Sequence, residues 1–153
     1  MRAKAREIST RRARIQKPRP TVPKGELPPY IFVYGTLKRG EKFHSELYKA
    51  PGVKYVGEAR IRGQLYRIRG ADFPGAIRTS LPNRYVAGQL FFMEHPQKTL
   101  AVLDEFEGVE EGLFHRELVD LRINGKPSKA WTYFYARPVQ QSDLLQIGVY
   151  SSE

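Results

Sequence analysis

The chain has 153 residues, of which 41% are hydrophobic, and a formal net charge of +10. This length predicts a single domain that can bury a core. The sequence contains no cysteine, which excludes disulfide frameworks, thiolate metal sites and cysteine nucleophiles. No apolar run approaches the length of a membrane span, so we expect a soluble protein without membrane contact. The lack of cysteine is compatible with a reducing compartment, and the location that we expect is the cytoplasm.

Most of the positive charge lies in residues 1–29, which hold nine basic side chains, two acidic ones and five prolines. Residues 30–153 are close to neutral in comparison, with 17 basic and 14 acidic side chains. We expect residues 1–29 to be a disordered basic extension and residues 30–153 to form the domain. The run Arg11-Arg12-Ala13-Arg14 is suited to weak, non-specific contact with nucleic acid, and a solvated extension without a partner is the alternative.

The domain opens with an apolar run, residues 30–33, that predicts a short buried strand. It is followed by Tyr34-Gly35-Thr36-Leu37, and Gly40 closes the loop. A strand that ends in Gly-Thr exposes consecutive backbone N–H groups, which can cradle a carboxylate or a phosphate. An ordinary glycine turn explains the same residues, and no Walker-type Gly-Lys-Ser/Thr follows them.

The rest of the chain predicts an α+β domain with five to seven strands and two or so short helices. Helices are expected over residues 44–50 and 97–106. Strands are expected over residues 53–68, with bends at its glycines, and over 76–79, 85–93, 114–123 and 129–135. The last two form a hairpin around Asn124-Gly125. Alternation on the final strand puts Trp131, Tyr133 and Tyr135 on one face and Phe134 on the other.

Candidate chemistry is limited to carboxylates near the glycine loop. The three histidines, His44, His95 and His115, are too scattered to suggest a metal site or a catalytic triad. Three acids fall at the end of the second helix, where the helix dipole disfavours added negative charge: Asp104, Glu105 and Glu107. A functional reason for one of them and simple solvation of all three both remain open.

Four segments together resemble the γ-glutamylcyclotransferase-like family, and in particular its γ-glutamylamine cyclotransferase-type members. They are Tyr34-Gly35-Thr36-Leu37-Lys38-Arg39-Gly40, Phe73-Pro74-Gly75-Ala76, Leu103-Asp104-Glu105-Phe106-Glu107-Gly108 and Tyr133-Phe134-Tyr135. The resemblance covers about residues 30–137. It implies a small mixed β-barrel flanked by helices.

The resemblance also implies an enzyme that converts a small γ-glutamyl amine or peptide to 5-oxoproline and a free amine. The reaction needs neither a metal nor an organic cofactor. The loop residues Tyr34, Gly35, Thr36 and Leu37 would hold the glutamyl moiety through their backbone, and Glu107 would be the acid and base. Asp104 and Glu105 would be its solvated neighbours. Tyr135 would form a hydrogen bond with the substrate. The alternative is that it is a tyrosine of the core.

Two further functions stay open beside this one. The first is a non-catalytic relative that binds a γ-glutamyl-like metabolite as a sensor or store. The second is a nucleic-acid-associated protein that acts through residues 1–29. Phe43 and Phe114 stand where relatives often carry Asn and Tyr, which bears on the choice of substrate. The sequence specifies neither the leaving amine nor the oligomeric state.

Overall fold

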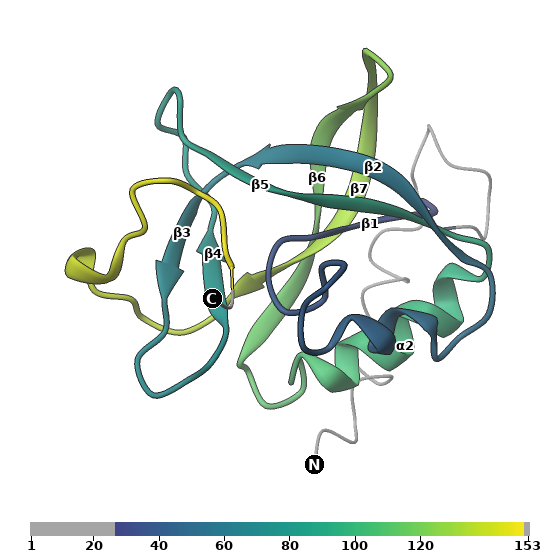
Figure 1. The fold of residues 1–153 in the computed structure, drawn as a ribbon, viewed down its shortest axis with the longest axis horizontal. Helices are drawn as coiled ribbons and strands as arrows, with labels where there is room; N and C mark the ends of the chain where they lie inside the picture. The colour runs from purple at the N-terminus through teal and green to yellow at the C-terminus, as the bar shows by residue number, and fades with distance from the viewer. Residues whose placement is uncertain (1–26, 152–153) are drawn as a thin grey trace.

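The computed structural model describes residues 27–151, which fold into two β-sheets and one α-helix (Figure 1). The strands are β1 (Tyr30–Val33), β2 (Val53–Arg62), β3 (Gln64–Arg67), β4 (Pro74–Ile77), β5 (Tyr85–Met93), β6 (Phe114–Ile123) and β7 (Lys126–Tyr135). The helices are α2 (Pro96–Phe106) and two single-turn 3₁₀ helices, η1 (His44–Tyr48) and η2 (Gln141–Asp143). The α+β class and the number of strands predicted from the sequence are confirmed for this part of the chain.

The main sheet has the strand order β2-β5-β1-β7-β6, with the short strand β1 at its centre. β1 pairs antiparallel with β5 and parallel with β7, where Ile31 is opposite Trp131. Both faces of β1 are covered, because Ile31 packs into one core and Phe32 into the other. A strand buried on both faces reads as a continuous apolar run, which is why residues 30–33 are apolar without a break.

The two cores lie on opposite faces of the main sheet. The first lies beneath α2, whose Leu100 and Leu103 are buried against Ile31 and Trp131. The second is closed by the small sheet β3–β4, through Leu65 and Ala76. The alternation predicted for β7 is confirmed, since Tyr133 belongs to the first core and Phe134 to the second.

The β6–β7 hairpin forms around Asn124 and Gly125, as the sequence predicts. Their φ angles of 53° and 78° fit the left-handed turn that Asn-Gly favours. The ladder begins at Lys126, directly after the turn, whereas the sequence predicted a start at residue 129. The helix expected over residues 44–50 is the single turn η1, which ends just before Pro51-Gly52.

The expected β-barrel is not confirmed, because the main sheet stays open. Its edge strands β2 and β6 approach each other, but no ladder joins them among the described residues. Within the described residues, β3 and β4 pair with each other and form no ladder with a strand of the main sheet. The chain leaves β2 at Gly63, where a Cβ atom would lie 3.1 Å from the carbonyl oxygen of Ile77. The fold is therefore a curved, open main sheet with a second, two-stranded sheet beside it.

The ends of the described region are tied to this framework. Of the predicted extension, residues 1–26 lie outside the described residues. The carbonyl of Pro28 accepts a hydrogen bond from the Trp131 indole at 3.2 Å, and that of Pro29 accepts one from the Met93 N–H at 2.7 Å. Toward the C-terminus, for which the sequence predicted no element, Leu145 N–H donates to the Leu65 carbonyl at 2.8 Å. Within residues 27–151, no helix combines the length and apolar character needed to cross a membrane.

Candidate active site

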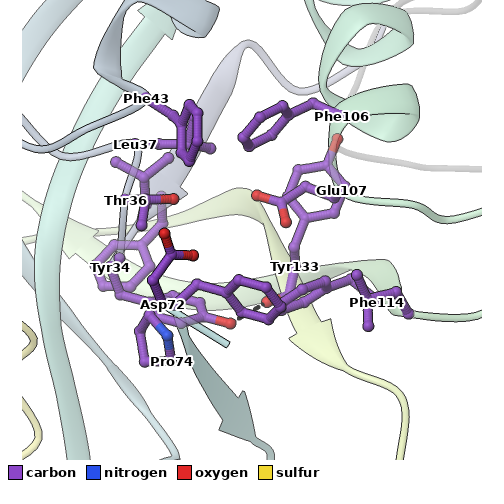
Figure 2. A pocket seen from close by; sticks show the side chains of 15 residues that line it. Tyr34, Thr36, Leu37, Phe43, Asp72, Pro74, Phe106, Glu107, Phe114 and Tyr133 are labelled. Atoms are coloured by element: carbon purple, nitrogen blue, oxygen red, sulfur yellow. Dashed lines mark hydrogen bonds between the residues drawn. The ribbon is translucent and has the colours of Figure 1, made fainter. Parts of the chain in front are cut away.

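A cavity of about 220 Å³ opens where β1 ends, between the first core and the loop before β4 (Figure 2). Predicted site residues from distant parts of the sequence meet there, since the whole of loop 34–37 and Glu107 line its wall. Aromatic side chains make up much of the remaining wall: Phe32, Phe43, Phe73, Phe106, Phe114 and Tyr133. Figure 2 shows the carboxylates of Glu107 and Asp72 and the side chain of Thr36 pointing into this space.

The loop after β1 offers backbone donors to the cavity. Lys38 N–H donates to the Gly35 carbonyl at 3.1 Å, and Phe43 N–H donates to the Thr36 carbonyl at 2.9 Å. These bonds use the carbonyl groups of Gly35 and Thr36. Among the described residues no backbone hydrogen bond uses the N–H groups of Gly35, Thr36 or Leu37. The loop therefore keeps donors that can bind an anionic group.

Position 35 needs a glycine because there is little room for a side chain, and not because the backbone angle is unusual. Its φ is not positive, in contrast to that of Gly40 at 83°. A Cβ atom on Gly35 would lie 3.0 Å from Cδ and 3.1 Å from Cγ of Pro74. The first residue of β4, Pro74, is thus packed directly against the loop, so the Pro-Gly segment and the glycine loop are in contact.

Glu107 is the first residue beyond α2, and its position is fixed by the way in which the helix ends. Its N–H still donates to the Leu103 carbonyl at 2.8 Å. The chain then reverses at Gly108, whose φ is 67°, and Val109 N–H donates back to the Asp104 carbonyl at 3.1 Å. The half-buried Glu107 side chain lies beside Phe106, whose ring centroid is 5.2 Å from that of Phe43.

Two buried tyrosines support the wall between the loop and Glu107. The Tyr34 hydroxyl donates to the Tyr133 carbonyl at 2.6 Å and accepts from the Ala76 N–H at 3.1 Å. The Tyr133 hydroxyl donates to Oδ1 of Asp104 at 2.7 Å. Burial raises the pKa of both phenols, and the nearby Glu107 charge raises it further. Both side chains therefore remain protonated donors over the physiological range.

Asp104 is not the solvated neighbour of Glu107 that the sequence predicted. It is fully buried, and Arg116 on β6 binds both of its carboxylate oxygens, at 2.8 and 3.0 Å. A signal for this was present in the sequence, because Leu100, Leu103, Asp104 and Glu107 share the three- and four-residue spacing of one helix face. Reading the acids as a cluster at a helix end overlooked that face.

Tyr135 lies outside the described lining of the cavity, and Tyr133 lies within it. The Tyr135 ring packs edge-on against Phe114, with 5.4 Å between the centroids, and Phe114 is part of the cavity wall. Sequence alternation placed both tyrosines on one face of β7 and could not tell which of them reaches the cavity. Asp72 and Tyr133 are lining residues that the sequence did not single out.

Asp72 and Lys42 form an ion pair at the mouth of the cavity, between the glycine loop and the loop before β4. The hydrogen bond from Lys42 lowers the pKa of Asp72, so this carboxylate stays charged near neutral pH. Both side chains are more than half exposed. Exposed pairs of this kind contribute little to stability, so we regard the pair as part of the rim.

A second cavity, of about 650 Å³, lies between the open edges β2 and β6, but its chemistry differs. Its four arginines already have partners within the protein: Arg60 stacks on Tyr85, Arg62 bonds the Leu81 carbonyl, Arg78 bonds Glu117 and Arg122 bonds the Gly125 carbonyl. Its one acid, Asp120, is paired with Lys129. Of these two cavities within the described residues, the smaller one joins a carboxylate to open backbone donors. Across residues 27–151, no three potential metal ligands gather at one point.

The chemistry that the first cavity can perform is proton transfer on a small anionic compound. The loop donors can hold a carboxylate, the two tyrosines stay protonated, and Glu107 can accept a proton from a bound amine and return it. The mostly apolar wall strengthens such electrostatic contacts, because it limits the amount of water around them.

Comparison with known proteins identifies relatives of this chain by sequence. Residues 31–152 match the gamma-glutamyl cyclotransferase, AIG2-like family. The gamma-L-glutamyl-butirosin B gamma-glutamyl cyclotransferase of Niallia circulans is 34% identical over 114 residues, which cover 71% of this chain and 68% of that protein.

Two solved structures share the fold at lower identity. The structure of an AIG2-like protein from Mus musculus aligns with a TM-score of 0.70 at 22% identity, over 84% of this chain and 91% of that one. That of YkqA from Bacillus subtilis aligns with a TM-score of 0.62 at 22% identity, over 81% of this chain. The present chain spans only 40% of the YkqA chain.

Proposed function

Because this chain belongs to the gamma-glutamyl cyclotransferase, AIG2-like family and is an enzyme of the γ-glutamylcyclotransferase type, we propose that it cyclises a small γ-glutamyl amine or peptide. The products would be 5-oxoproline and a free amine. One observation carries the proposal: Glu107 and the donor loop 34–37 line the same small, largely apolar cavity.

In this proposal the loop binds the glutamyl moiety. Its α-carboxylate accepts hydrogen bonds from the backbone N–H groups of residues 35–37, which no backbone bond within the described chain uses. The α-ammonium then lies toward Glu107 on the opposite wall. The reacting nitrogen and the γ-carbonyl carbon belong to one molecule, so much of the catalysis consists of holding that molecule folded.

Glu107 would move the protons. Its carboxylate takes a proton from the α-ammonium, and the neutral amine attacks the γ-carbonyl carbon to form a new C–N bond. The bond between that carbon and the leaving nitrogen then breaks, while Glu107 returns the proton to the departing nitrogen. The ring nitrogen releases a second proton that follows the same route, so the amine leaves as an ammonium ion and 5-oxoproline keeps one N–H. Atoms and charge balance without water or a redox partner, and the enzyme ends in its starting state.

The leaving amine extends to the mouth of the cavity. A cavity of about 220 Å³ is smaller than common sites for drug-sized ligands, which measure about 300–1,000 Å³. It suits the glutamyl part alone. The amine would pass between Phe43 and Phe73 toward the rim at Asp72, so these residues would influence which amine is accepted. We keep the cytoplasm as the proposed compartment, because a chain without cysteine needs no oxidising environment to mature.

A panel of γ-glutamyl compounds tests the proposal. Amines, amino acids and larger amino compounds, each carrying a γ-glutamyl group, are incubated with the full chain, and the release of 5-oxoproline is measured. Release from at least one of them supports the proposal, whereas the matching α-glutamyl compounds serve as controls and should give none. Binding of γ-glutamyl compounds without any release would favour the non-catalytic alternative.

A further inference from the structure

Three buried polar side chains form a connected group immediately behind Glu107. They are Asp104 on α2, Arg116 on β6 and Tyr133 on β7, all at most 3% exposed. The Arg116 guanidinium donates through Nε to Oδ1 and through Nη2 to Oδ2 of Asp104, at 2.8 and 3.0 Å. The Tyr133 hydroxyl donates to the same Oδ1 at 2.7 Å, and Arg116 also stacks on Trp131 at 4.5 Å. We call this group the Asp104 network.

Core stability alone does not account for the Asp104 network. Moving two charges out of water is costly, and apolar residues of similar volume often give an equally stable core. The position of the network is more informative. Asp104 lies three residues before Glu107, and its carbonyl accepts the Val109 N–H at 3.1 Å, in the turn that directs Glu107 into the cavity. Tyr133 lines that same cavity.

We propose that the Asp104 network positions Glu107 and sets the local charge against which this carboxylate accepts and returns its proton. This inference rests on the function proposed above. Asp104 and Tyr133 are positioning residues, because they act through Glu107. Arg116 neutralises Asp104, so that Glu107 faces a balanced pair rather than a buried charge. Tyr133 connects the end of α2 to the wall that also carries Tyr34.

Among the described residues, no second pair of opposite charges is buried behind Glu107. Outside the network, the elements around Glu107 carry these titratable and charged groups: Tyr34 after β1, Lys42 and Asp72 at the rim, Lys98 and Glu105 on α2, Glu110 and Glu111 in the following turn, His115, Glu117, Asp120 and Arg122 on β6, and Lys126, Lys129 and Tyr135 on β7. Glu105, Glu110 and Glu111 are exposed, where solvent weakens their effect. Asp104 and Arg116 are the buried charges among the described residues, so solvent weakens their effect on Glu107 least.

Two charge variants test the proposal. The first should lower the pKa of Glu107, and the second should raise it again. Asp104→Asn removes one buried negative charge and keeps the Arg116 cation, so the pKa of Glu107 should fall by about one unit. Adding Arg116→Gln to that variant removes the cation and should return the pKa to the parent value. Glu105→Gln removes one negative charge from the exposed side of the same helix and should leave the pKa unchanged.

The readout is the titration of the Glu107 carboxylate, followed by carbon-13 NMR in the full chain without substrate, together with the acidic limb of kcat/KM against pH. The NMR titration does not depend on turnover, so it tests the network even if the parent protein proves inactive. A merely structural role predicts that the double variant is worse than the single one. An unmoved Glu107 titration in Asp104→Asn, or a further departure in the double variant, would overturn the proposal.

Tyr133→Phe tests the positioning role without changing a charge, and it remains informative if Asp104→Asn does not fold. Losing the bond to Asp104 should loosen the wall beside Glu107 and lower kcat by about tenfold or more, with little change in KM. Phe134→Leu, on the opposite face of the same strand, is the control for altered packing of β7. Unchanged kcat in a folded Tyr133→Phe would contradict the role assigned to Tyr133.

Discussion

The Tyr34 hydroxyl donates a 2.6 Å hydrogen bond to the carbonyl oxygen of Tyr133, across 99 positions of sequence. The same hydroxyl accepts the Ala76 N–H, so one buried phenol joins the end of β1 to β4 and β7. Each of these segments borders the cavity. The shape of the site therefore depends on a side chain that the sequence marked only as part of a glycine loop.

The buried tyrosines predict a loss of stability in alkali. The folded state holds the protons of Tyr34 and Tyr133, because their pKa values are raised, whereas the unfolded chain releases them above about pH 10. The unfolded state then binds fewer protons. The free energy of unfolding should therefore fall by about 1.4 kcal/mol per pH unit for each tyrosine. Urea unfolding between about pH 9 and 11 measures this slope.

Tyr34→Phe should remove the contribution of one tyrosine to that slope. Tyr48→Phe, at an exposed position on η1, is the matched control for the loss of a hydroxyl and should keep the parent slope. If Tyr34→Phe and Tyr48→Phe gave the same slope as the parent protein, the Tyr34 phenol would not be the group that holds its proton.

Gly35→Ala should weaken the binding of 5-oxoproline. The new Cβ atom would lie 3.0 Å from Pro74 Cδ, so the loop or Pro74 has to move, and the N–H groups of the loop move with it. The loss of one hydrogen bond to a charged group, about 1.5 kcal/mol, corresponds to roughly tenfold in affinity. Isothermal titration calorimetry measures it.

Gly63→Ala is the control for crowding at a glycine. Its Cβ atom would meet the Ile77 carbonyl at 3.1 Å, a similar approach, but Gly63 lies outside the described lining of the cavity. Gly63→Ala should lower the melting temperature as much as Gly35→Ala does and leave the binding of 5-oxoproline unchanged. The weaker binding of Gly35→Ala would then result from the loop and not from the loss of stability. Equal loss of binding in the two variants would contradict that attribution.

Removing the basic extension should leave the stability of the domain unchanged only if the cut is made before residue 27. Deleting residues 1–26 should change neither the melting temperature nor turnover, and it should remove most binding to polyanions. Deleting residues 1–28 also removes Leu27 from the first core and the carbonyl partner of the Trp131 indole. That cut should cost about 1–3 kcal/mol, because a buried N–H loses its acceptor. Equal melting temperatures for the two truncations would contradict this boundary.

Local signals in the sequence located most elements of the fold. Tyr85–Met93 and Phe114–Ile123 have the predicted bounds, because apolar composition and the Asn-Gly turn act over a few residues. The separation of β3 and β4 from the main sheet was not predicted. It depends on which strands pair over long distances, and their pattern of residues is compatible with either sheet.

The sequence also predicted part of the candidate site. Loop 34–37 and Glu107 were selected by resemblance, and both line one cavity. The roles of Asp104 and Arg116 were missed because an acid in an acidic run gives no local sign of burial. Its partner, Arg116, lies 12 positions away on β6. Tyr133 was missed for a related reason, since alternation gives the face of a strand but not the depth at which a side chain meets a cavity.

Turnover and binding by Glu107→Gln test the central claim most directly. Glutamine keeps the shape of the side chain but cannot exchange a proton near neutral pH, and general acid–base catalysis supplies about 10²–10⁴-fold in rate. Glu105→Gln is the matched control on the exposed side of α2. The account predicts that Glu107→Gln binds the γ-glutamyl substrate about as well as the parent and loses at least 100-fold in 5-oxoproline release, roughly the lower end of that range. Parent-like release by a folded Glu107→Gln would contradict it.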